Sequence, residues 1–441
     1  MASIPFQPAA APQGQIASGN LPESLLVSLA PLSHDAFENT LAHLSEAFAG
    51  STVLVATPDL PVGSADHFPT GPETNDTGDA GQGRGFVSGQ ELANRYTNLH
   101  LITEPAAVPP PGAWVLTAAD FLNAFKLAQQ HNASACLLLG AEAQSLSPAA
   151  LRSLAAAVGG VGETAATADL AVPRYDLGPR DGLVNSAILY PMSRAVYGAR
   201  PRFPLAIDLG LSLRMAERMA AAAQKYTVSG QNDALLWPVA EAAVAGFGIA
   251  ELGAGKRAIP QPATTDLNSL LARITASLFS DVEARAAFWQ RSRIAQHPAK
   301  NTVPQKAATN GFADLDVQPM LDSFRLAYSN LQEIWSLVLP PNSLLGLKRL
   351  AASDPQTFRM ADALWVRILY DFLLAYRLRT INRGHLLGAL TPLYLAWVAS
   401  HIIYARSGVD PERHIEELAQ AFEFDKPYLV SRWRWPDRFN P

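Results

Sequence analysis

PRYDLGPRDGLVNSAILYPMSRAVYGARPRFPLAIDLGLS, residues 173–212, lies where the sequence pattern of this chain changes. Before it, short β-branched runs alternate with segments of helical periodicity, and a strand is expected to end at its first residue, Pro173. Beyond it, from residue 267 onward, the periodicity is almost entirely helical. Strands that alternate with helices wind into a mostly parallel sheet. The sequence therefore predicts an α/β region followed by an all-helical region.

The individual elements follow from apolar runs, helical spacing and capping residues. Ser33 and the pair Ser147-Pro148 have the pattern of helix starts, a cap residue followed in the second case by proline. The expected strands are residues 25–30, 52–56, 99–103, 135–139, 168–173 and 248–252. The expected helices after residue 212 are 213–225, 235–245, 267–291, 317–338, 358–379, 385–405 and 411–424.

Length and composition favour two domains in a chain that can bury a large interior. The chain has 441 residues, of which 49% are hydrophobic and 17% charged. We expect an α/β domain at residues 21–263, a helical domain at 264–441, a disordered tail at 1–20 without a signal peptide, and a flexible loop at 58–90. The net charge of −5 gives no reason to expect nucleic acid as a partner. The single cysteine, Cys136, lies in an apolar run and indicates a core residue in a reducing cytoplasm.

One segment is apolar enough to raise the question of a membrane. Residues 386–403 are almost uncharged and near spanning length. Pro392 and His401 interrupt them, and charged residues punctuate the helix expected before them. A buried helical hairpin is therefore favoured over a membrane-associated helical scaffold.

Residues 173–212 resemble a segment, YDG.ITN…YPLTRALYG.R.RQPIGGDFG.S, of bacterial GT-A glycosyltransferases related to the mannosylglycerate and glucosylglycerate synthases. The matching positions are Asp181, Gly182, Asn185, Tyr190, Pro191, Arg194, Tyr197, Gly198, Arg200, Arg202, Pro204, Asp208, Gly210 and Ser212. Residues 382–400, NRGHLLGALTPLYLAWVAS, also resemble the family signature LNREHLL.ALTPLYLGWVASF. This resemblance, which covers most of residues 21–435, implies a GT-A fold that transfers sugar from a nucleotide-diphosphate sugar to a small acceptor.

The family's metal ligands are altered in this chain. In the family an Asp-Ser-Asp at the end of a buried strand holds Mg²⁺ or Mn²⁺, and here Gly140, Ala141 and Glu142 stand in its place. The resemblance implies that Glu142 binds the metal or the diphosphate; otherwise it is a solvated loop residue. A histidine ligand of the family corresponds to Ala258. Neighbouring Lys256 and Arg257 are then candidate charge partners for phosphate, or simply a solvated basic turn.

Two further acids match family positions. Asp208 would hydrogen-bond the sugar, or cap the helix that follows it; the two glycines that precede this acid in the family are Ala206 and Ile207 here. Asp233 would lie at the reacting centre or the acceptor, or else complement the dipole of a helix N-terminus.

Two hypotheses of function follow. The first is a glycosyltransferase in the cytoplasm whose partners are a nucleotide sugar and a small acceptor, with a weak Mg²⁺ or Mn²⁺ site. The second is a catalytically inactive GT-A paralogue that serves as a nucleotide-sugar sensor or a structural partner, which the losses at Gly140, Ala141, Ile207 and Ala258 favour. Peripheral membrane contact and self-association stay open. The donor, the acceptor and the stereochemical outcome are not specified by the sequence.

Overall fold

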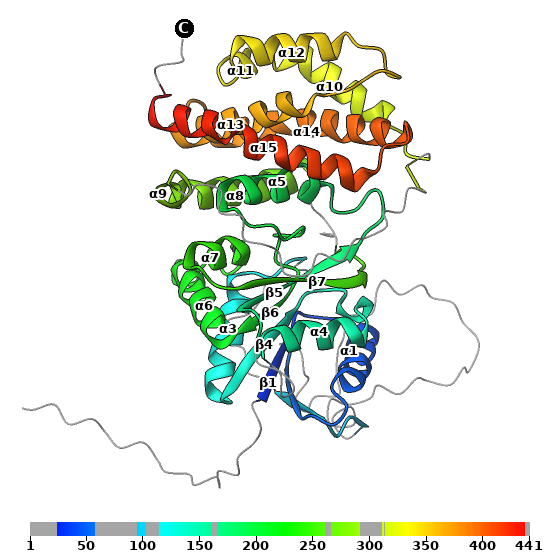
Figure 1. Ribbon diagram of the computed structural model, residues 1–441, viewed down its shortest axis with the longest axis vertical. Coiled ribbons are helices and arrows are strands. Elements are labelled where there is room, and N and C mark those ends of the chain that lie inside the picture. Colours follow the sequence, from blue (N-terminus) through cyan, green and yellow to red (C-terminus); the bar gives the residue numbers. More distant parts are fainter. Residues whose placement is uncertain are drawn as a thin grey trace, which may run out of the picture.

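The computed structural model describes residues 24–57, 95–102, 114–159, 166–260, 266–291, 311–312 and 314–436. A sheet with its covering helices forms one end of the molecule, and layers of helices form the other (Figure 1). The tail expected at 1–20, the loop expected at 58–90 and the domain boundary expected near Ala263 lie outside the described residues.

The seven-stranded sheet has the order β3-β2-β1-β4-β6-β5-β7. Its neighbouring strands are parallel except at β6, which runs antiparallel to both β4 and β5. The bounds are β1 Ser24–Leu29, β2 Val53–Ala56, β3 Leu99–Ile102, β4 Ala133–Leu139, β5 Leu170–Asp176, β6 Asp208–Ser212 and β7 Ile249–Lys256. The prediction of a mostly parallel sheet is confirmed, whereas β6 was not predicted.

Helices connect and cover the strands. They are α1 (His34–Ala47), α3 (Ala118–Gln130), α4 (Pro148–Ala157), α6 (Leu213–Thr227) and α7 (Pro238–Ala245). The predicted caps are confirmed, since the hydroxyls of Ser33 and Ser147 accept hydrogen bonds from backbone amides of α1 and α4. Helix α7 begins later than predicted. Pro238 disfavours helical geometry at the preceding Trp237, and proline is itself favourable at the first position of a helix. Leu235 does not enter the helix and forms a β-bridge with Thr117.

The centre of the sheet is apolar on both faces. Every residue of β4 except Ser134 is buried, and Cys136 is fully enclosed. Burial raises the pKa of the Cys136 thiol to about 12, so the sulfur is an inert core atom as predicted.

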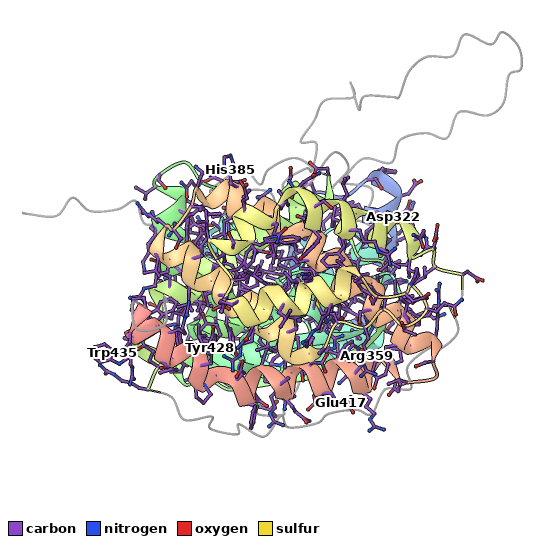
Figure 2. All side chains as sticks on the ribbon, turned by 90° about the horizontal axis from the view of Figure 1, so that it is seen from above. Asp322, Arg359, His385, Glu417, Tyr428 and Trp435 are labelled. Carbon is purple, nitrogen blue, oxygen red and sulfur yellow. The ribbon has the colours of Figure 1, made fainter. Side chains whose placement is uncertain are left out.

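The helical region stacks in layers above the sheet (Figure 1). Nearest the sheet lie η2 (Asn185–Leu189), α5 (Tyr190–Tyr197), α8 (Leu267–Ala284) and α9 (Ala286–Trp289). The next layer holds α13 (Asp362–Leu378), α14 (Arg383–Arg406) and α15 (Pro411–Arg434), and the outermost holds α10 (Gln318–Asn330), α11 (Gln332–Ser336) and α12 (Pro341–Ala351). Viewed from this end, His385, Glu417 and Trp435 lie at the periphery (Figure 2).

Helix α14 is the apolar segment that raised the membrane question. It is long and apolar enough to cross a bilayer, but 78% of its most apolar window is buried inside the protein. It packs against α8 and α10, and the indole of Trp397 lies 1% exposed at its centre. Within this structure α14 is therefore a core helix.

The two regions are joined by polar contacts as well as by apolar packing. Helix α5 packs along α15, and Arg194 of α5 pairs with Glu416 and Glu423 of α15 at 2.6 and 2.9 Å. The indole N–H of Trp365 on α13 donates to the carbonyl of Ala187 in η2 at 2.8 Å. Because these bonds are buried or partly buried, they hold α15 against α5 and α13 against η2.

Candidate functional site

The first candidate region lies where β4 ends. Strand β6 is antiparallel to β4, so its first residue, Asp208, lies opposite Leu139, the last residue of β4. The loop that follows β4 begins with Gly140 and Ala141. Ligands in open α/β sheets bind beyond the carboxyl ends of strands, so this is the position where the resemblance places the diphosphate.

The carboxylate of Asp208 is fully engaged by the protein. Arg257 donates to both of its oxygens, from Nε at 2.9 Å and from Nη2 at 3.1 Å. The hydroxyl of Tyr175 donates to one oxygen at 2.7 Å and the amide of Gly140 to the other at 3.1 Å. Burial and the neighbouring Asp208 charge raise the pKa of the Tyr175 hydroxyl well above its usual range, which keeps it a donor. The side chains of Asp208 and Arg257 are both 0% exposed.

Arg257 also binds the loop after β4. Its Nη2 donates to the carbonyl of Ala141 at 2.7 Å, and its Nη1 contacts the carbonyls of Glu142 and Ala258 and the hydroxyl of Ser145. Every guanidinium nitrogen thus has a protein acceptor. A phosphate role for Arg257 remains a prediction, but such contact would require one of these bonds to break.

Glu142 lies beside this network, and its charge contributes to raising the pKa of Arg257. Its side chain is exposed, its backbone is left-handed at φ 64°, and its carboxylate accepts a 2.7 Å bond from Gln144. A Cβ added at Gly140 would lie 2.7 Å from the carbonyl oxygen of Ile207, so a second acid at the end of β4 has no room. With Asp208 already saturated by donors, the residues present do not fit a divalent ion.

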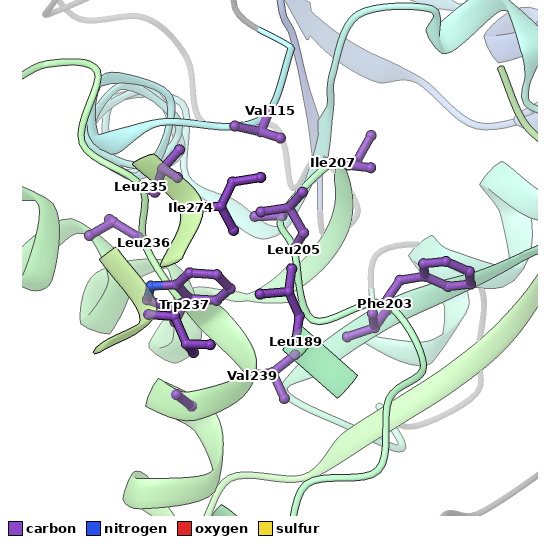
Figure 3. Close-up of a cluster of buried hydrophobic side chains, with 14 of the residues drawn as sticks. Val115, Leu189, Phe203, Leu205, Ile207, Leu235, Leu236, Trp237, Val239 and Ile274 are labelled. Atoms are coloured by element: carbon purple, nitrogen blue, oxygen red, sulfur yellow. The ribbon is translucent and has the colours of Figure 1, made fainter. Parts of the chain in front are cut away.

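Asp233 does not join this network. It lies in the segment before α7, is 55% exposed, and pairs with Arg273 of α8 at 2.9 Å. The residues that follow Asp233 and those that precede Asp208 meet in an apolar cluster (Figure 3). Its members include Val115, Leu205, Ile207, Leu235, Leu236, Trp237 and Ile274. Ile207 is 2% exposed, and Trp114 in the same core is 9% exposed. Ile207, which directly precedes Asp208, therefore belongs to the apolar core.

A cavity lies beside this network, at the carboxyl ends of β5 and β7, and Tyr175 and Arg257 of the network line it. Its volume is about 660 Å³, within the range of small-molecule sites. The sheet contributes Arg174, Asp176 and Lys256, and the helical region closes the cavity with Glu412 of α15 and His401 of α14. Lys256, the one predicted binding residue with an accessible side chain on this cavity, is exposed and forms no ion pair with any described residue.

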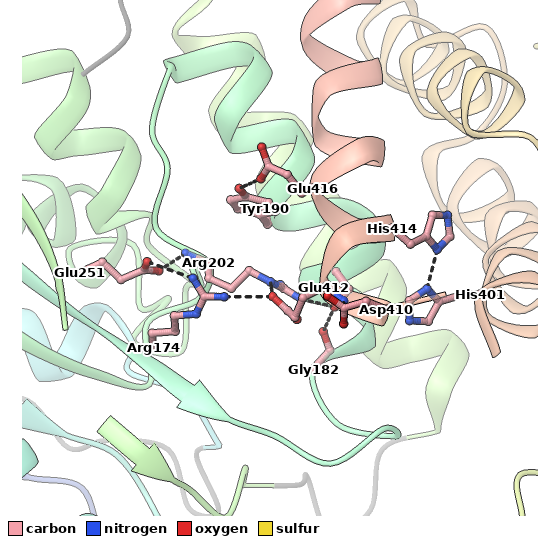
Figure 4. Close-up of polar contacts among 11 residues, drawn as sticks. Arg174, Gly182, Tyr190, Arg202, Glu251, His401, Asp410, Glu412, His414 and Glu416 are labelled. Carbon is pink, nitrogen blue, oxygen red and sulfur yellow. Dashed lines mark hydrogen bonds and ion pairs between the residues drawn. The ribbon is translucent and has the colours of Figure 1, made fainter. Parts of the chain in front are cut away.

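Arg174 and Arg202 line both this cavity and a smaller one beside it (Figure 4). Arg174 pairs with Glu412 at 3.1 Å and with Glu251 at 3.9 Å, and Arg202 also pairs with Glu412, at 3.2 Å. Burial raises the pKa of the Glu251 carboxyl despite the nearby arginines. Glu412 begins α15, so these bonds also tie the helical region to the sheet.

Arg202 has donor capacity left. Its guanidinium lies 5.3 Å from the ring centre of Tyr190 and 5.2 Å from that of Phe203. Nε and Nη2 bind Glu412 and the hydroxyl of Ser186, but Nη1 is buried without a hydrogen-bond partner among the described residues. A buried guanidinium N–H without an acceptor is costly, and an anion in the cavity could satisfy it.

This cavity was not predicted from the sequence. Arg174 and Arg202 both lie in the opening stretch, and His401 was noted only as an interruption of an apolar segment. Their convergence depends on how α14 and α15 dock, which no local spacing encodes. Comparison with protein-family models finds no match, and neither does comparison with curated proteins.

Proposed function

We propose that this chain is a non-catalytic relative of GT-A glycosyltransferases that binds a small anionic ligand in the cavity between the sheet and the helical region. The observation that carries the proposal is the contrast between two neighbouring regions at the carboxyl edge of one sheet. Beyond β4 the acids are missing, saturated or exposed, whereas beyond β5 and β7 a ligand-sized cavity gathers basic side chains.

The region beyond β4 supports the non-catalytic part of the proposal. The Arg257 guanidinium sits between Asp208 and the loop carbonyls, where it supplies a fixed positive charge from within the protein. Ile207 and its apolar neighbours occupy the adjoining space. A nucleotide sugar that needed a metal ion beside Asp208 would have to displace both.

The cavity supports the ligand-binding part. Lys256 is accessible and unpaired in the described structure, and Arg202 keeps an unused N–H. The carboxylates of Asp176 and Glu412 also line the cavity, so the site is not purely basic. This mixture of charges favours a small ligand with both charged and neutral polar groups. The resemblance, with its small acceptor, points to a compound the size of glycerate or phosphoglycerate.

Calorimetric titration of the full chain with glycerate and with phosphoglycerate tests the proposal. We expect binding that weakens with added salt, because the recognition is by charge. Lys256→Ala should weaken phosphoglycerate binding about 3- to 10-fold, the effect of one charge-assisted hydrogen bond. Lys225→Ala, at an exposed lysine of α6, is the matched control and should leave the affinity unchanged. If neither compound binds, or if both variants behave alike, the proposal fails.

An active glycosyltransferase is the second candidate. Glu142 favours it, because a non-glycine residue in left-handed geometry with an exposed carboxylate at the end of a strand is a feature that clusters at functional sites. In that case the cavity would hold the acceptor. Release of nucleotide from a nucleotide sugar distinguishes the two candidates, since only the enzyme turns over.

A further inference from the structure

Two histidines and an aspartate form a buried chain that ends at the cavity. His401 of α14 and His414 of α15 face each other with their Nδ1 atoms 2.8 Å apart (Figure 4). Nε2 of His414 lies 3.1 Å from a carboxylate oxygen of Asp362 on α13. The two imidazoles are stacked, with ring centres 5.0 Å apart, and Trp397 stacks on His401 at 5.1 Å. His401 is 2% exposed and His414 is 5% exposed.

The partners of these rings determine where the protons lie. An ionised carboxylate only accepts hydrogen bonds, so when each ring carries a single proton, His414 donates from Nε2 to Asp362 and its Nδ1 is an acceptor. The proton between the two Nδ1 atoms then belongs to His401. Burial, His414 and Arg202 lower the pKa of His401 to about 3, so this ring is neutral at physiological pH. Its Nε2 consequently carries a lone pair and no proton.

That lone pair faces the proposed ligand site. His401 lines the 660 Å³ cavity, and its Nε2 has no hydrogen-bond partner among the described residues. On the same cavity Arg202 has the complementary unused group, a buried N–H. One wall therefore offers an unpaired acceptor and an unpaired donor.

We propose that His401 is a specificity-determining residue that accepts a hydrogen bond from a hydroxyl group of the bound anion, and that His414 and Asp362 are positioning residues that fix its tautomer. The proposal rests on the ligand site proposed above, and narrows the ligand to an anion that also carries a hydroxyl group. The family signature that residues 382–400 resemble continues with phenylalanine at the position of His401, which could not accept such a bond.

The tautomer can be measured without any ligand. In long-range proton–nitrogen NMR spectra of the full chain at neutral pH, we expect His401 to carry its proton on Nδ1 and His414 on Nε2. Asp362→Asn should mix these states, because an amide can donate as well as accept. A purely structural stack would show no such dependence on Asp362. Protonation of His401 at Nε2 in the unmodified chain would overturn the inference.

The specificity is tested with glycerate and propionate, which share a carbon skeleton and a carboxylate but differ in hydroxyl groups. We expect the unmodified chain to bind glycerate about 3- to 10-fold more tightly than propionate, the effect of one hydrogen bond to a buried acceptor. His401→Phe should remove this preference while propionate binding is kept. His401→Asn, which retains an acceptor, should restore part of it. His385→Phe, at an exposed histidine of the same helix, is the control.

The outcomes separate the two proposals. Equal binding of glycerate and propionate by the unmodified chain overturns the role of His401 and leaves the anion site intact. The same holds if His401→Phe keeps the preference. Binding of neither compound overturns the anion site, and the role of His401 with it.

Discussion

The ion pair of Arg257 and Asp208 yields a quantitative prediction, because both side chains are fully buried and joined by two hydrogen bonds. Replacement of Arg257 by methionine leaves the Asp208 carboxylate without its counter-ion and removes the donor from the carbonyl of Ala141. Truncation of one partner of such a pair costs about 3–5 kcal/mol of unfolding free energy. Asp208→Asn should cost less, because the amide oxygen can still accept from either Tyr175 or Gly140. Arg257 also keeps its hydrogen bonds to backbone carbonyls.

A double-mutant cycle measured by urea unfolding tests this reasoning. The double variant Arg257→Met with Asp208→Asn should be less destabilised than the sum of the two single variants, with a coupling of about 2–3 kcal/mol. Lys256→Met, at the exposed neighbour of Arg257, is the control and should change stability by less than about 0.5 kcal/mol. If Arg257→Met changes stability as little as this control, or if the effects of the two single substitutions simply add, Arg257 does not act as an internal cation that holds the loop after β4.

Two further predictions concern Gly140 and Asp371. Gly140→Ala should lower the unfolding free energy by about 1–3 kcal/mol, since the new methyl group meets the carbonyl of Ile207. Gly253→Ala is the control and should be near neutral, because the space around Gly253 is open. Equal effects of the two substitutions in thermal melts would refute the contact. Burial raises the pKa of the Asp371 carboxyl on α13 to about 6. The protonated carboxyl therefore contributes its full stability below the pKa of the unfolded chain, near 3.8, and this stability is lost as the pH rises through 6. Asp371→Asn should therefore stabilise the chain by on the order of 2–3 kcal/mol at neutral pH and by nothing near pH 4, as urea titrations across this range would show; a pH-independent difference would contradict it.

Local chemistry was enough to predict most of the sheet and its helices. The β-branched run before Thr57 and the caps at Ser33 and Ser147 specify their elements through contacts within a few residues. Strand β6 was missed because its five residues include Gly210 and lead directly into a helix, so nothing in its own sequence marks it as a strand. It forms only because β4 and β5 offer it unpaired edges.

The candidate site was harder to predict for the same reason. Asp208, Glu142 and Arg257 come together through the antiparallel placement of β6, and that placement also turned Arg257 inward onto protein carbonyls. Resemblance suggested which residues matter but not whether their charges stay accessible. The pairing of His401 with His414 depends on the docking of α14 against α15, and no residue spacing along either helix reveals it.

The most direct test of the central claim, binding without sugar transfer, is nucleotide release from UDP- and GDP-sugars by the full chain in the presence of Mn²⁺ and glycerate. We predict no release above the protein-free background, because Arg257 is paired with Asp208 in the interior and the adjoining Ile207 is buried. Sustained release that Glu142→Ala abolishes would contradict the claim and establish the chain as a glycosyltransferase.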